Sequence, residues 1–314
     1  MSAVIEVEGL TKRYNSHLAV DNVSFEVRVG EVFGFLGPNG AGKTTTQRML
    51  TGVLRPTEGR ALVLGRDIVS DPVGAKERMG VVPEVANPYM EMTASQNMAF
   101  AGELYGLPGV QIRSRSEELL REFDLWERRD DIARHYSKGM KQRLILAMSL
   151  IHEPRVLFLD EPTAGLDVAS RRMIHGQVRN FAAAGMTVFY TTHNIEEASV
   201  LCDRVGIICK GTLAALDTPE ALKSTLAGSQ SVEVAFGEPV DLAMLEDFEE
   251  VTHGEKQGDK LRLFTPAPGD LIEHLVSFAQ ERDLAILTVN TLGPSLEEVF
   301  VSLSSDTSRS GGPR

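Results

Sequence analysis

Long apolar runs separated by helix-like segments form the main pattern of the first two thirds of the chain. Such runs occupy 31–36, 156–159 and 187–192, and each has the length of one strand. A strand buried on both faces, as in a parallel sheet, has a continuous apolar run instead of an alternating one. Residues 43–54 are compatible with a helix, and 140–151 repeat apolar side chains at helical spacing. The pattern predicts an α/β fold built on a buried sheet.

The last third of the chain has a different pattern, which predicts a small α+β domain. Strands are predicted at 231–236, 249–253, 260–265 and 284–290, and helices at 240–248, 271–282 and 295–303. Without the last helix, the order β-α-β-β-α-β fits a ferredoxin-like split unit. Ser295 and Glu298 have the spacing of a capping box at the start of that last helix.

The charge composition changes at the same place and supports a division into two domains. Residues 1–228 carry 26 Lys and Arg against 28 Asp and Glu, a net charge of −2. Residues 229–314 carry 6 against 16, a net charge of −10, so most of the formal charge of −12 lies there. We expect one domain at 1–228, a second at 229–303 and a disordered tail at 304–314. Neither part has the excess of basic residues that binding to nucleic acid requires.

No apolar run approaches the roughly 18 residues that are needed to cross a bilayer. The first residues, Met1 to Glu8, lack a basic region followed by an apolar one. We therefore expect the chain to remain in the cytoplasm.

A glycine-rich segment lies between the first apolar run and the helix-compatible stretch, which is the context that a phosphate-binding loop requires. It consists of Gly37, Pro38, Asn39, Gly40, Ala41, Gly42, Lys43, Thr44 and Thr45. Its glycines allow backbone N–H groups to point at an anion, and the helix N-terminus adds its own free N–H groups. Lys43 would bring positive charge to the β- and γ-phosphates, and the Thr44 hydroxyl would ligate Mg²⁺. The bare pattern also arises by chance, so the assignment to ATP and Mg²⁺ depends on the flanking strand and helix.

The second apolar run ends in two acids, Asp160 and Glu161. In open α/β folds the carboxyl end of such a strand is where ligands bind. Asp160 would reach the Mg²⁺ shell, and Glu161 is placed to act as general base on a water that attacks the γ-phosphate. A strand that simply ends in two solvated acids is the alternative interpretation.

The segment Tyr136–Arg143 resembles the signature peptide of ABC ATPases, which is usually Leu-Ser-Gly-Gly-Gln. Ala164–Asp167 and His193 resemble the D-loop and the switch histidine of that family. Tyr14 stands where the family stacks an aromatic side chain on adenine, and Val20 where it often adds an apolar contact. All of these segments occur in family order over residues 1–228, and the ordered series is more specific than any one motif.

This resemblance implies a homodimer that sandwiches two ATP molecules. Each site would use Lys43, Glu161 and His193 of one subunit and Ser137 of the other. The neighbouring signature and D-loop residues that the resemblance assigns to nucleotide binding are Lys138, Gly139, Met140 and Asp167. Lys138 and Met140 depart from the usual glycine and glutamine, although similar Ser-Lys-Gly-Met signatures occur in one branch of bacterial exporters.

Three of these residues also have simpler explanations. Ser137 precedes a predicted helix and is explained equally by N-capping. His193 follows a predicted strand, where a histidine is often only solvated or hydrogen-bonded. Tyr14 follows two basic residues, and an exposed tyrosine there needs no ligand.

Glu84 stands where the Q-loop of the family typically has glutamine. Either side chain offers an oxygen to Mg²⁺, but a carboxylate adds a charge near Asp160 and Glu161. Like charges in one site raise one pKa unless the metal offsets them. We expect a working site in which Glu84 makes activity more dependent on Mg²⁺.

The segment Pro294–Phe300 resembles the tail of ATPases from antibiotic-resistance-type ABC exporters, the daunorubicin-resistance-like group. This resemblance implies separate permease subunits, a peripheral position on the inner face of the membrane, and a helical subdomain at about 84–151. In that subdomain Met90, Met92, Met98 and Phe100 are either a docking surface for the permease or ordinary core.

Two other functional classes remain open. A soluble ABC ATPase that is not coupled to transport would share every motif, and a resistance protein that binds a drug directly would need ATP only as a structural ligand. The transported substrate is not encoded in these motifs, because substrate contacts in such systems belong to the permease.

Overall fold

The computed structural model describes residues 3–85, 87–225, 230–293 and 295–309. The chain divides into two compact units, Met1–Thr218 and Pro219–Arg314. The domain boundary predicted at 228 lies outside the described residues. The division comes earlier in the chain because helix α8 packs against helix α11 within the second unit; these helices are Pro219–Ser224 and Leu296–Arg309.

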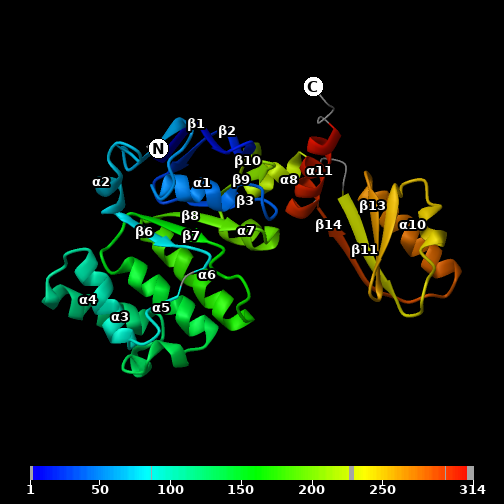
Figure 1. Ribbon diagram of the computed structural model, residues 1–314. Coiled ribbons are helices and arrows are strands. Elements are labelled where there is room, and N and C mark those ends of the chain that lie inside the picture. The colour runs from blue at the N-terminus through cyan, green and yellow to red at the C-terminus, as the bar shows by residue number, and fades with distance from the viewer. Residues whose placement is uncertain (1–2, 86, 226–229, 294, 310–314) are drawn as a thin grey trace. The chain divides into compact units, whose positions relative to one another are not determined.

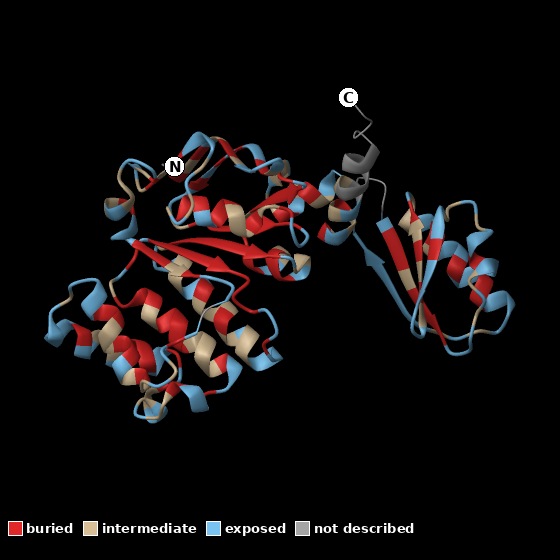
Figure 2. Cartoon of the chain, in the orientation of Figure 1, coloured by how far each residue is buried: buried red, intermediate tan, exposed pale blue. Residues whose placement is uncertain are grey.

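The first unit contains a six-stranded sheet in the order β10-β9-β3-β8-β7-β6 (Figure 1). In that order the strands are Thr212–Asp217, Arg204–Cys209, Val32–Leu36, Thr187–Thr192, Val156–Asp160 and Met79–Val82. Neighbouring strands are parallel except for β10, which runs antiparallel to β9. Strands β3, β7 and β8 are buried over their whole length, as the apolar runs predict (Figure 2). Their carboxyl ends therefore meet at one edge of the sheet.

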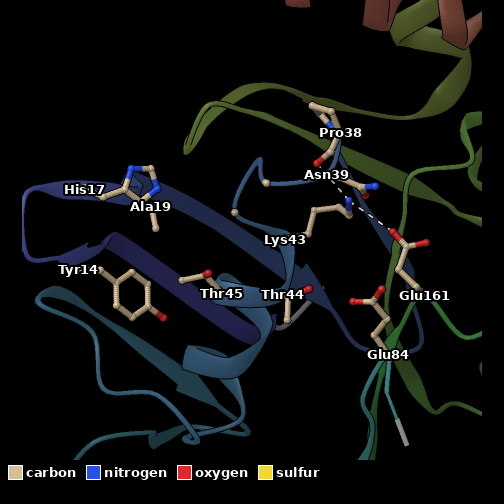
Figure 3. Close-up of a pocket in the computed structure, with 12 residues that line it drawn as sticks. Tyr14, His17, Ala19, Pro38, Asn39, Lys43, Thr44, Thr45, Glu84 and Glu161 are labelled. Carbon is tan, nitrogen blue, oxygen red and sulfur yellow. Dashed lines mark hydrogen bonds and ion pairs between the residues drawn. The ribbon is translucent and has the colours of Figure 1, made fainter.

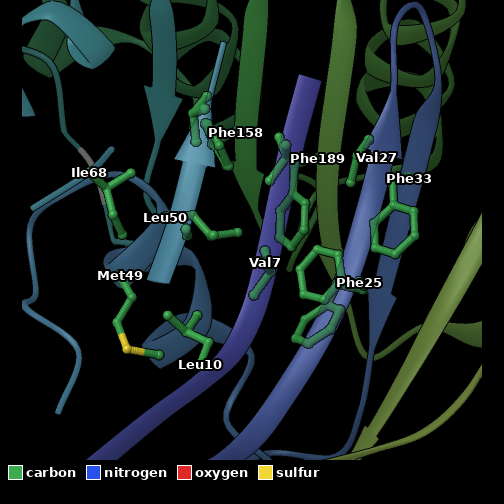
Figure 4. Close-up of a cluster of buried hydrophobic side chains, with 14 of the residues drawn as sticks. Val7, Leu10, Phe25, Val27, Phe33, Met49, Leu50, Ile68, Phe158 and Phe189 are labelled. Carbon is green, nitrogen blue, oxygen red and sulfur yellow. The ribbon is translucent and has the colours of Figure 1, made fainter. Parts of the chain in front are cut away.

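A second, antiparallel sheet of the first unit has the order β2-β1-β4-β5. Its strands, in that order, are His17–Arg28, Ala3–Tyr14, Glu58–Val63 and Arg66–Asp67. The main core lies between the two sheets, where Phe25 of β2 stacks on Phe33 of β3 at 5.4 Å between ring centroids, and Phe189 lies 5.8 Å from Phe33 (Figure 4). Stacked aromatic rings fill this space and fix the distance between the sheets.

Helices of the first unit lie on both faces of the six-stranded sheet, α1 on one face and α5 and α6 on the other, whereas α3 and α4 lie away from it (Figure 1). They are α1 Lys43–Leu50, α2 Pro72–Lys76, α3 Ala94–Leu104, α4 Gly109–Glu122, α5 Lys138–Leu150, α6 Val168–Ala183 and α7 Ile195–Leu201, with short 3₁₀ turns at Trp126–Arg128 and Ala133–His135. Helix α1 contributes Met49 and Leu50 to the main core (Figure 4). Because only the glycine-rich loop separates α1 from β3, the helix begins at the sheet edge where β3 ends.

Helices α3, α4 and α5 pack against one another and form the helical part that the sequence predicts between 84 and 151. Thr93 begins α3 with a capping box, in which Gln96 N–H donates to Thr93 Oγ1 and Thr93 N–H donates to Gln96 Oε1. Met98 is completely buried, so core packing is the correct interpretation for that methionine. The mixed sheet and helical part confirm the predicted α/β class.

The second unit contains an antiparallel sheet in the order β12-β13-β11-β14. The strands, in chain order, are β11 Gln230–Phe236, β12 His253–Gln257, β13 Lys260–Thr265 and β14 Ile286–Leu292, and the helices between them are α9 Ala243–Glu246 and α10 Pro268–Glu281. This order and pairing are those of a split β-α-β-β-α-β unit. Leu271, Leu275 and Phe278 of α10 pack on the sheet and form its core.

Two predicted elements of the second unit are displaced. Strand β12 begins at His253 instead of 249. A two-residue turn at Gly258 and Asp259 pairs Gln257 with Lys260, and this register extends along the hairpin to the pair His253 and Phe264. Helix α9 is correspondingly shorter than the helix predicted at 240–248.

The last helix extends beyond its predicted end. Helix α11 starts with the expected capping box, in which Glu298 N–H donates to Ser295 Oγ and Ser295 N–H donates to Glu298 Oε2. It continues to Arg309, so the tail predicted to be disordered from 304 is helical over its first part. No glycine or proline interrupts the sequence before Gly311. Residues 310–314 lie outside the described residues. Along the described ranges, no helix has both the length and the apolar character of a membrane span.

Candidate active site

A cavity of about 410 Å³ opens beside the carboxyl end of β3 and the start of α1 (Figure 3). Its lining combines the glycine-rich loop with residues from three other segments. The lining residues are Tyr14, His17, Ala19, Pro38, Asn39, Gly40, Gly42, Lys43, Thr44, Thr45, Glu84 and Glu161. The structure therefore places most of the predicted phosphate loop in one cavity with Tyr14, Glu84 and Glu161.

The loop needs glycine at two of its positions for different reasons. Gly42 has a φ of 113° at the N-cap of α1, a conformation that other residues rarely adopt. Gly37 has no space for a side chain, because an added Cβ would lie 2.5 Å from the carbonyl oxygen of Ile208. No side chain caps α1. Its first N–H groups are therefore available to an anion, and the helix dipole favours negative charge at this end.

Lys43 lies at the base of this loop, with only 6% of its surface exposed. Its ammonium donates to the carbonyl oxygens of Gly37 at 2.7 Å and Pro38 at 3.3 Å. It also forms an ion pair with Glu161, with 3.4 Å between Nζ and Oε1 (Figure 3). A buried ammonium needs such oxygen partners, and phosphate oxygens offer the same kind of partner with more charge.

Glu161 connects Lys43 to the predicted switch histidine. Its second carboxylate oxygen, Oε2, lies 2.7 Å from Nδ1 of His193, whose side chain is 56% exposed. The Glu161 backbone has a φ of +49°, and its N–H donates to the Thr191 carbonyl oxygen at 3.1 Å. A residue other than glycine in this left-handed region costs roughly 1–3 kcal/mol and is typical of functional sites. The chain turns at Glu161 and directs its carboxylate to the cavity.

Asp160 is almost completely buried at the end of β7. Its Oδ1 accepts hydrogen bonds from the hydroxyls of Thr191 and, at 3.4 Å, Thr44. Glu84 lines the cavity on the same side as Glu161 (Figure 3). Thr44 supplies a hydroxyl and Asp160 and Glu84 supply carboxylates, the hard oxygen donors that Mg²⁺ prefers.

The described residues contain no group of three or more His, Cys, Asp and Glu side chains arranged to hold a metal by themselves. This donor set still fits Mg²⁺, which proteins usually bind through one or two carboxylates together with the phosphates of a substrate.

The signature segment lies apart from this cavity. Ser137 is the N-cap of α5 and accepts a hydrogen bond from the Met140 N–H at 3.2 Å, so the predicted capping role is present. Lys138 Nζ donates to the Ala164 carbonyl oxygen at 2.8 Å, which ties the signature to the D-loop. Gly139 packs beside Ser170 of α6.

Asp167 of the D-loop caps α6. It accepts hydrogen bonds from the N–H and the hydroxyl of Ser170, and the N–H bond is the main cause that lowers the Asp167 pKa. The signature and the D-loop form a second surface with α5 and α6, and neither segment lines the cavity of a single chain.

Around the outer part of the cavity, Tyr14 is 43% exposed, with Lys12 Nζ 5.3 Å from its ring centroid. Val20 is buried in the main core, and Ala19 lines the cavity in its place. His17 also lines the cavity and was not predicted. Tyr14 and His17 pair across the β1–β2 turn, and a hairpin recognised at this point would have indicated their proximity.

A buried group beside the cavity was also missed by sequence reasoning. Glu197 of α7 lies below the surface and contacts the hydroxyls of Thr163 and Thr192, which follow Glu161 and precede His193 respectively. No sequence motif indicated this glutamate, because its partners come from distant parts of the chain.

Comparison with known proteins supports the same interpretation. Residues 20–164 match the family model described as ABC transporter. Nod factor export ATP-binding protein I of Ralstonia nicotianae is 39% identical over 303 residues, which cover 96% of this chain and 94% of that protein. Daunorubicin resistance ATP-binding protein DrrA2 of Streptomyces coeruleorubidus is 38% identical over 305 residues, covering 96% and 94%.

Solved structures show the same fold for the first part of the chain. The structure of cbiO1 from Clostridium perfringens, described as part of the ABC transporter complex cbiONQ, is 28% identical and has a TM-score of 0.65. The likeness covers 71% of this chain and 91% of that one. Since these relatives match nearly the whole sequence at 38% and 39% identity, the chain belongs to the ABC transporter family as an ATP-binding ATPase subunit.

Proposed function

We propose that two copies of this subunit close around two ATP molecules and that hydrolysis drives a separate membrane permease in the direction of export. One observation carries the proposal. Lys43 and Glu161 face one cavity, with His193 bonded to Glu161, whereas Ser137 and its neighbours form a separate helix N-terminus. A nucleotide site that uses both parts therefore needs a second chain.

ATP binding uses the phosphate loop and the outer part of the cavity. The N–H groups at the start of α1 and the ammonium of Lys43 hold the phosphates. Tyr14 stacks on the adenine, a contact that contributes about 1 kcal/mol. Helix α5 of the partner subunit approaches the γ-phosphate with its N-terminus at Ser137, where its dipole favours negative charge.

Thr44, Asp160 and Glu84 would hold Mg²⁺ together with phosphate oxygens. When bound, the ion neutralises charge on the phosphates and orients them.

Glu161 acts as the general base of hydrolysis. Its carboxylate accepts a proton from water as the water oxygen bonds to the γ-phosphorus, and the bond between that phosphorus and the bridging oxygen of ADP breaks. His193, whose Nδ1 lies 2.7 Å from Glu161 Oε2, holds the carboxylate in position. Lys43 balances the charge that moves to the departing ADP oxygens.

Coupling to transport follows from closure of the dimer. Contacts from two subunits to each ATP shift an equilibrium between open and closed dimers, and the permease follows that shift. The relatives named for Nod factor export and daunorubicin resistance support export by this subunit. The subunit then lies on the inner face of the membrane, held there by its permease.

The assignment of the base is tested with Glu161→Gln. We expect this variant to bind ATP, to remain in the closed dimer, and to hydrolyse ATP at least about 100-fold more slowly, because the amide cannot accept the proton. Steady-state hydrolysis and sedimentation with ATP measure the two effects. Undiminished hydrolysis would refute the role of Glu161.

Coupling to a permease is tested by co-purification and by ATPase activity after reconstitution. Retention of a multi-span membrane protein by this subunit, with an ATPase rate that rises on reconstitution, supports a transporter. An ATPase that retains no membrane partner supports the alternative of a soluble ABC ATPase that is not coupled to transport.

A further inference from the structure

A buried cluster of polar side chains lies directly behind the catalytic residues. At its centre the carboxylate of Glu197 is only 6% exposed. Its Oε1 accepts from the Thr163 hydroxyl at 2.7 Å and lies 2.6 Å from Nε2 of His175, and its Oε2 accepts from the Thr192 hydroxyl at 3.0 Å. Both carboxylate oxygens are therefore occupied by side chains from other elements.

These partners belong to the segments that carry the reaction. Thr163 follows Glu161 by two residues, in the turn after β7. Thr192 immediately precedes His193 at the end of β8. One carboxylate thus joins the segment of the base to the segment of the switch histidine.

The third partner, His175, comes from the middle of α6, the helix that the D-loop residue Asp167 caps. The cluster therefore also connects the segments of Glu161 and His193 to helix α6, which lies beside Gly139 of the signature segment. In the proposed dimer this element lies near the partner subunit.

We propose that Glu197 is a positioning residue for ATP hydrolysis, which fixes Glu161 and His193 relative to each other and connects both to α6 through His175. This inference rests on the proposed roles of Glu161 and His193. Glu197 acts through Thr163, Thr192 and His175, which hold its two carboxylate oxygens.

The surroundings of Glu197 explain why a hydrogen-bond acceptor is required at this position. Desolvation acts to raise its pKa, but hydrogen bonds from His175, Thr163 and Thr192 outweigh burial and hold the pKa below its usual value. Removing such a group leaves buried donors without an acceptor. An apolar side chain of similar size would fill the space but would not hold the three donors.

Other polar groups close to the cluster do not join the same three segments as Glu197 does. The Tyr190 hydroxyl lies 3.3 Å from Thr163 Oγ1, and burial raises its pKa well above its usual range, so it remains neutral. Arg171 and His193 line a small cavity of about 130 Å³ together with Glu197. Among the described residues, no ion pair joins Arg171 to Glu197. His175 is the basic residue that contacts Glu197, with 2.6 Å between Nε2 and Oε1.

The first experiment compares Glu197→Ala with Glu197→Gln in the full-length ATPase. We expect the alanine variant to lose about 10- to 100-fold in kcat, with KM for ATP changed by less than about twofold, because ATP binding does not use this cluster. The glutamine variant keeps one acceptor oxygen and should recover to within about threefold of the wild-type kcat. Glu196→Ala is the matched control, because Glu196 is the exposed neighbour on the same helix.

A second pair of variants tests the connection to α6. His175→Gln keeps a donor near the position of Nε2, and His175→Leu removes it. We expect the leucine variant to lower kcat by about fivefold or more at unchanged KM and the glutamine variant to restore it. This pair also keeps the proposal testable if Glu197→Ala fails to fold.

A second control separates positioning from stability. Glu31 is also buried, accepts from the Arg28 N–H and pairs with Arg204 at 3.2 Å, but it lies at the opposite end of β3. Glu31→Ala should lower the unfolding temperature without lowering kcat at a temperature where the protein is folded. The proposal is overturned if Glu197→Ala keeps its kcat, or if its kcat falls only as far as that of Glu31→Ala.

These experiments distinguish a failure of the base assignment from a failure of the positioning role. If Glu161→Gln remains active, the proposed function is wrong at Glu161, and a loss of kcat in Glu197→Ala then shows only that His193 is positioned. If Glu161→Gln is inactive while Glu197→Ala and His175→Leu match wild type, the base assignment stands and the positioning role is refuted.

Discussion

Two adjacent acids at the end of β7 have different surroundings, and the difference suits different roles. Asp160 is buried and accepts from two threonine hydroxyls, which fixes the orientation of its carboxylate. Glu161 turns toward the cavity with a lysine on one oxygen and a histidine on the other. An oriented carboxylate suits a metal, and one with exchangeable partners suits proton transfer.

A prediction at the residue scale concerns Glu84. We expect Glu84→Gln to raise the Mg²⁺ concentration for half-maximal ATPase activity by roughly three- to tenfold, because the amide attracts the ion less strongly than a carboxylate. ATPase rate and nucleotide affinity measured against Mg²⁺ check this. The same Mg²⁺ dependence in both proteins would count against a role for Glu84 near the metal.

At this scale the sequence predicts the residues that belong to continuous motifs. Lys43, Thr44 and Glu161 lie where the motifs predict them, at the edge of the parallel sheet. Glu197 and His175 were not predicted, because their contacts join positions 22 residues apart in sequence that meet only when the sheet is formed.

At the scale of elements, buried strands and capped helices are the features that the sequence pattern predicts well. The apolar runs at 31–36, 156–159 and 187–192 correspond to β3, β7 and β8. The antiparallel strands β1 and β2 were not predicted, although Val23, Phe25 and Val27 alternate with polar residues along β2. Their register, which shifts several times between the two strands, does not follow from that alternation. Such irregularities follow from pairing between strands, which a local pattern does not reveal.

The capping box of α3 provides a prediction at the element scale. Thr93→Ala should lower the free energy of unfolding by about 1 kcal/mol, because the Gln96 N–H loses its acceptor. Trp126, the only tryptophan in the sequence, lies in the first unit and reports this unfolding by its fluorescence in urea. Thr93→Ser keeps the hydroxyl and serves as control. Equal urea midpoints for the alanine and serine variants would contradict the role of the cap.

At the scale of the whole molecule, the proposed nucleotide site is divided between two surfaces, and two copies of the chain would be needed to complete it. Lys43 and Glu161 lie in one cavity, and Ser137 caps a helix outside it. A face-to-face dimer with twofold symmetry would complete two identical sites at once. The sequence predicts this only through resemblance to a family, because neither surface by itself indicates its partner.

Mixing inactive variants tests this arrangement. Lys43→Ala and Ser137→Arg should each be inactive, but a 1:1 mixture should recover about a quarter of the wild-type ATPase rate, because half of the dimers then contain one intact site. A mixture of Lys43→Ala and Glu161→Gln is the control. Both lesions affect the same surface, so no intact site can form. If the first mixture stays inactive although the chains associate, the shared site is refuted.

The ion pair between Lys43 and Glu161 connects the residue proposed to bind phosphate with the residue proposed to act as the base. In this structure the ammonium that attracts phosphate also neutralises the carboxylate that would take a proton from water. A triphosphate that draws Lys43 toward its own oxygens would free Oε1 of Glu161 from this contact. In the proposed mechanism, phosphate binding and release of the base would thus be linked through one side chain, Lys43.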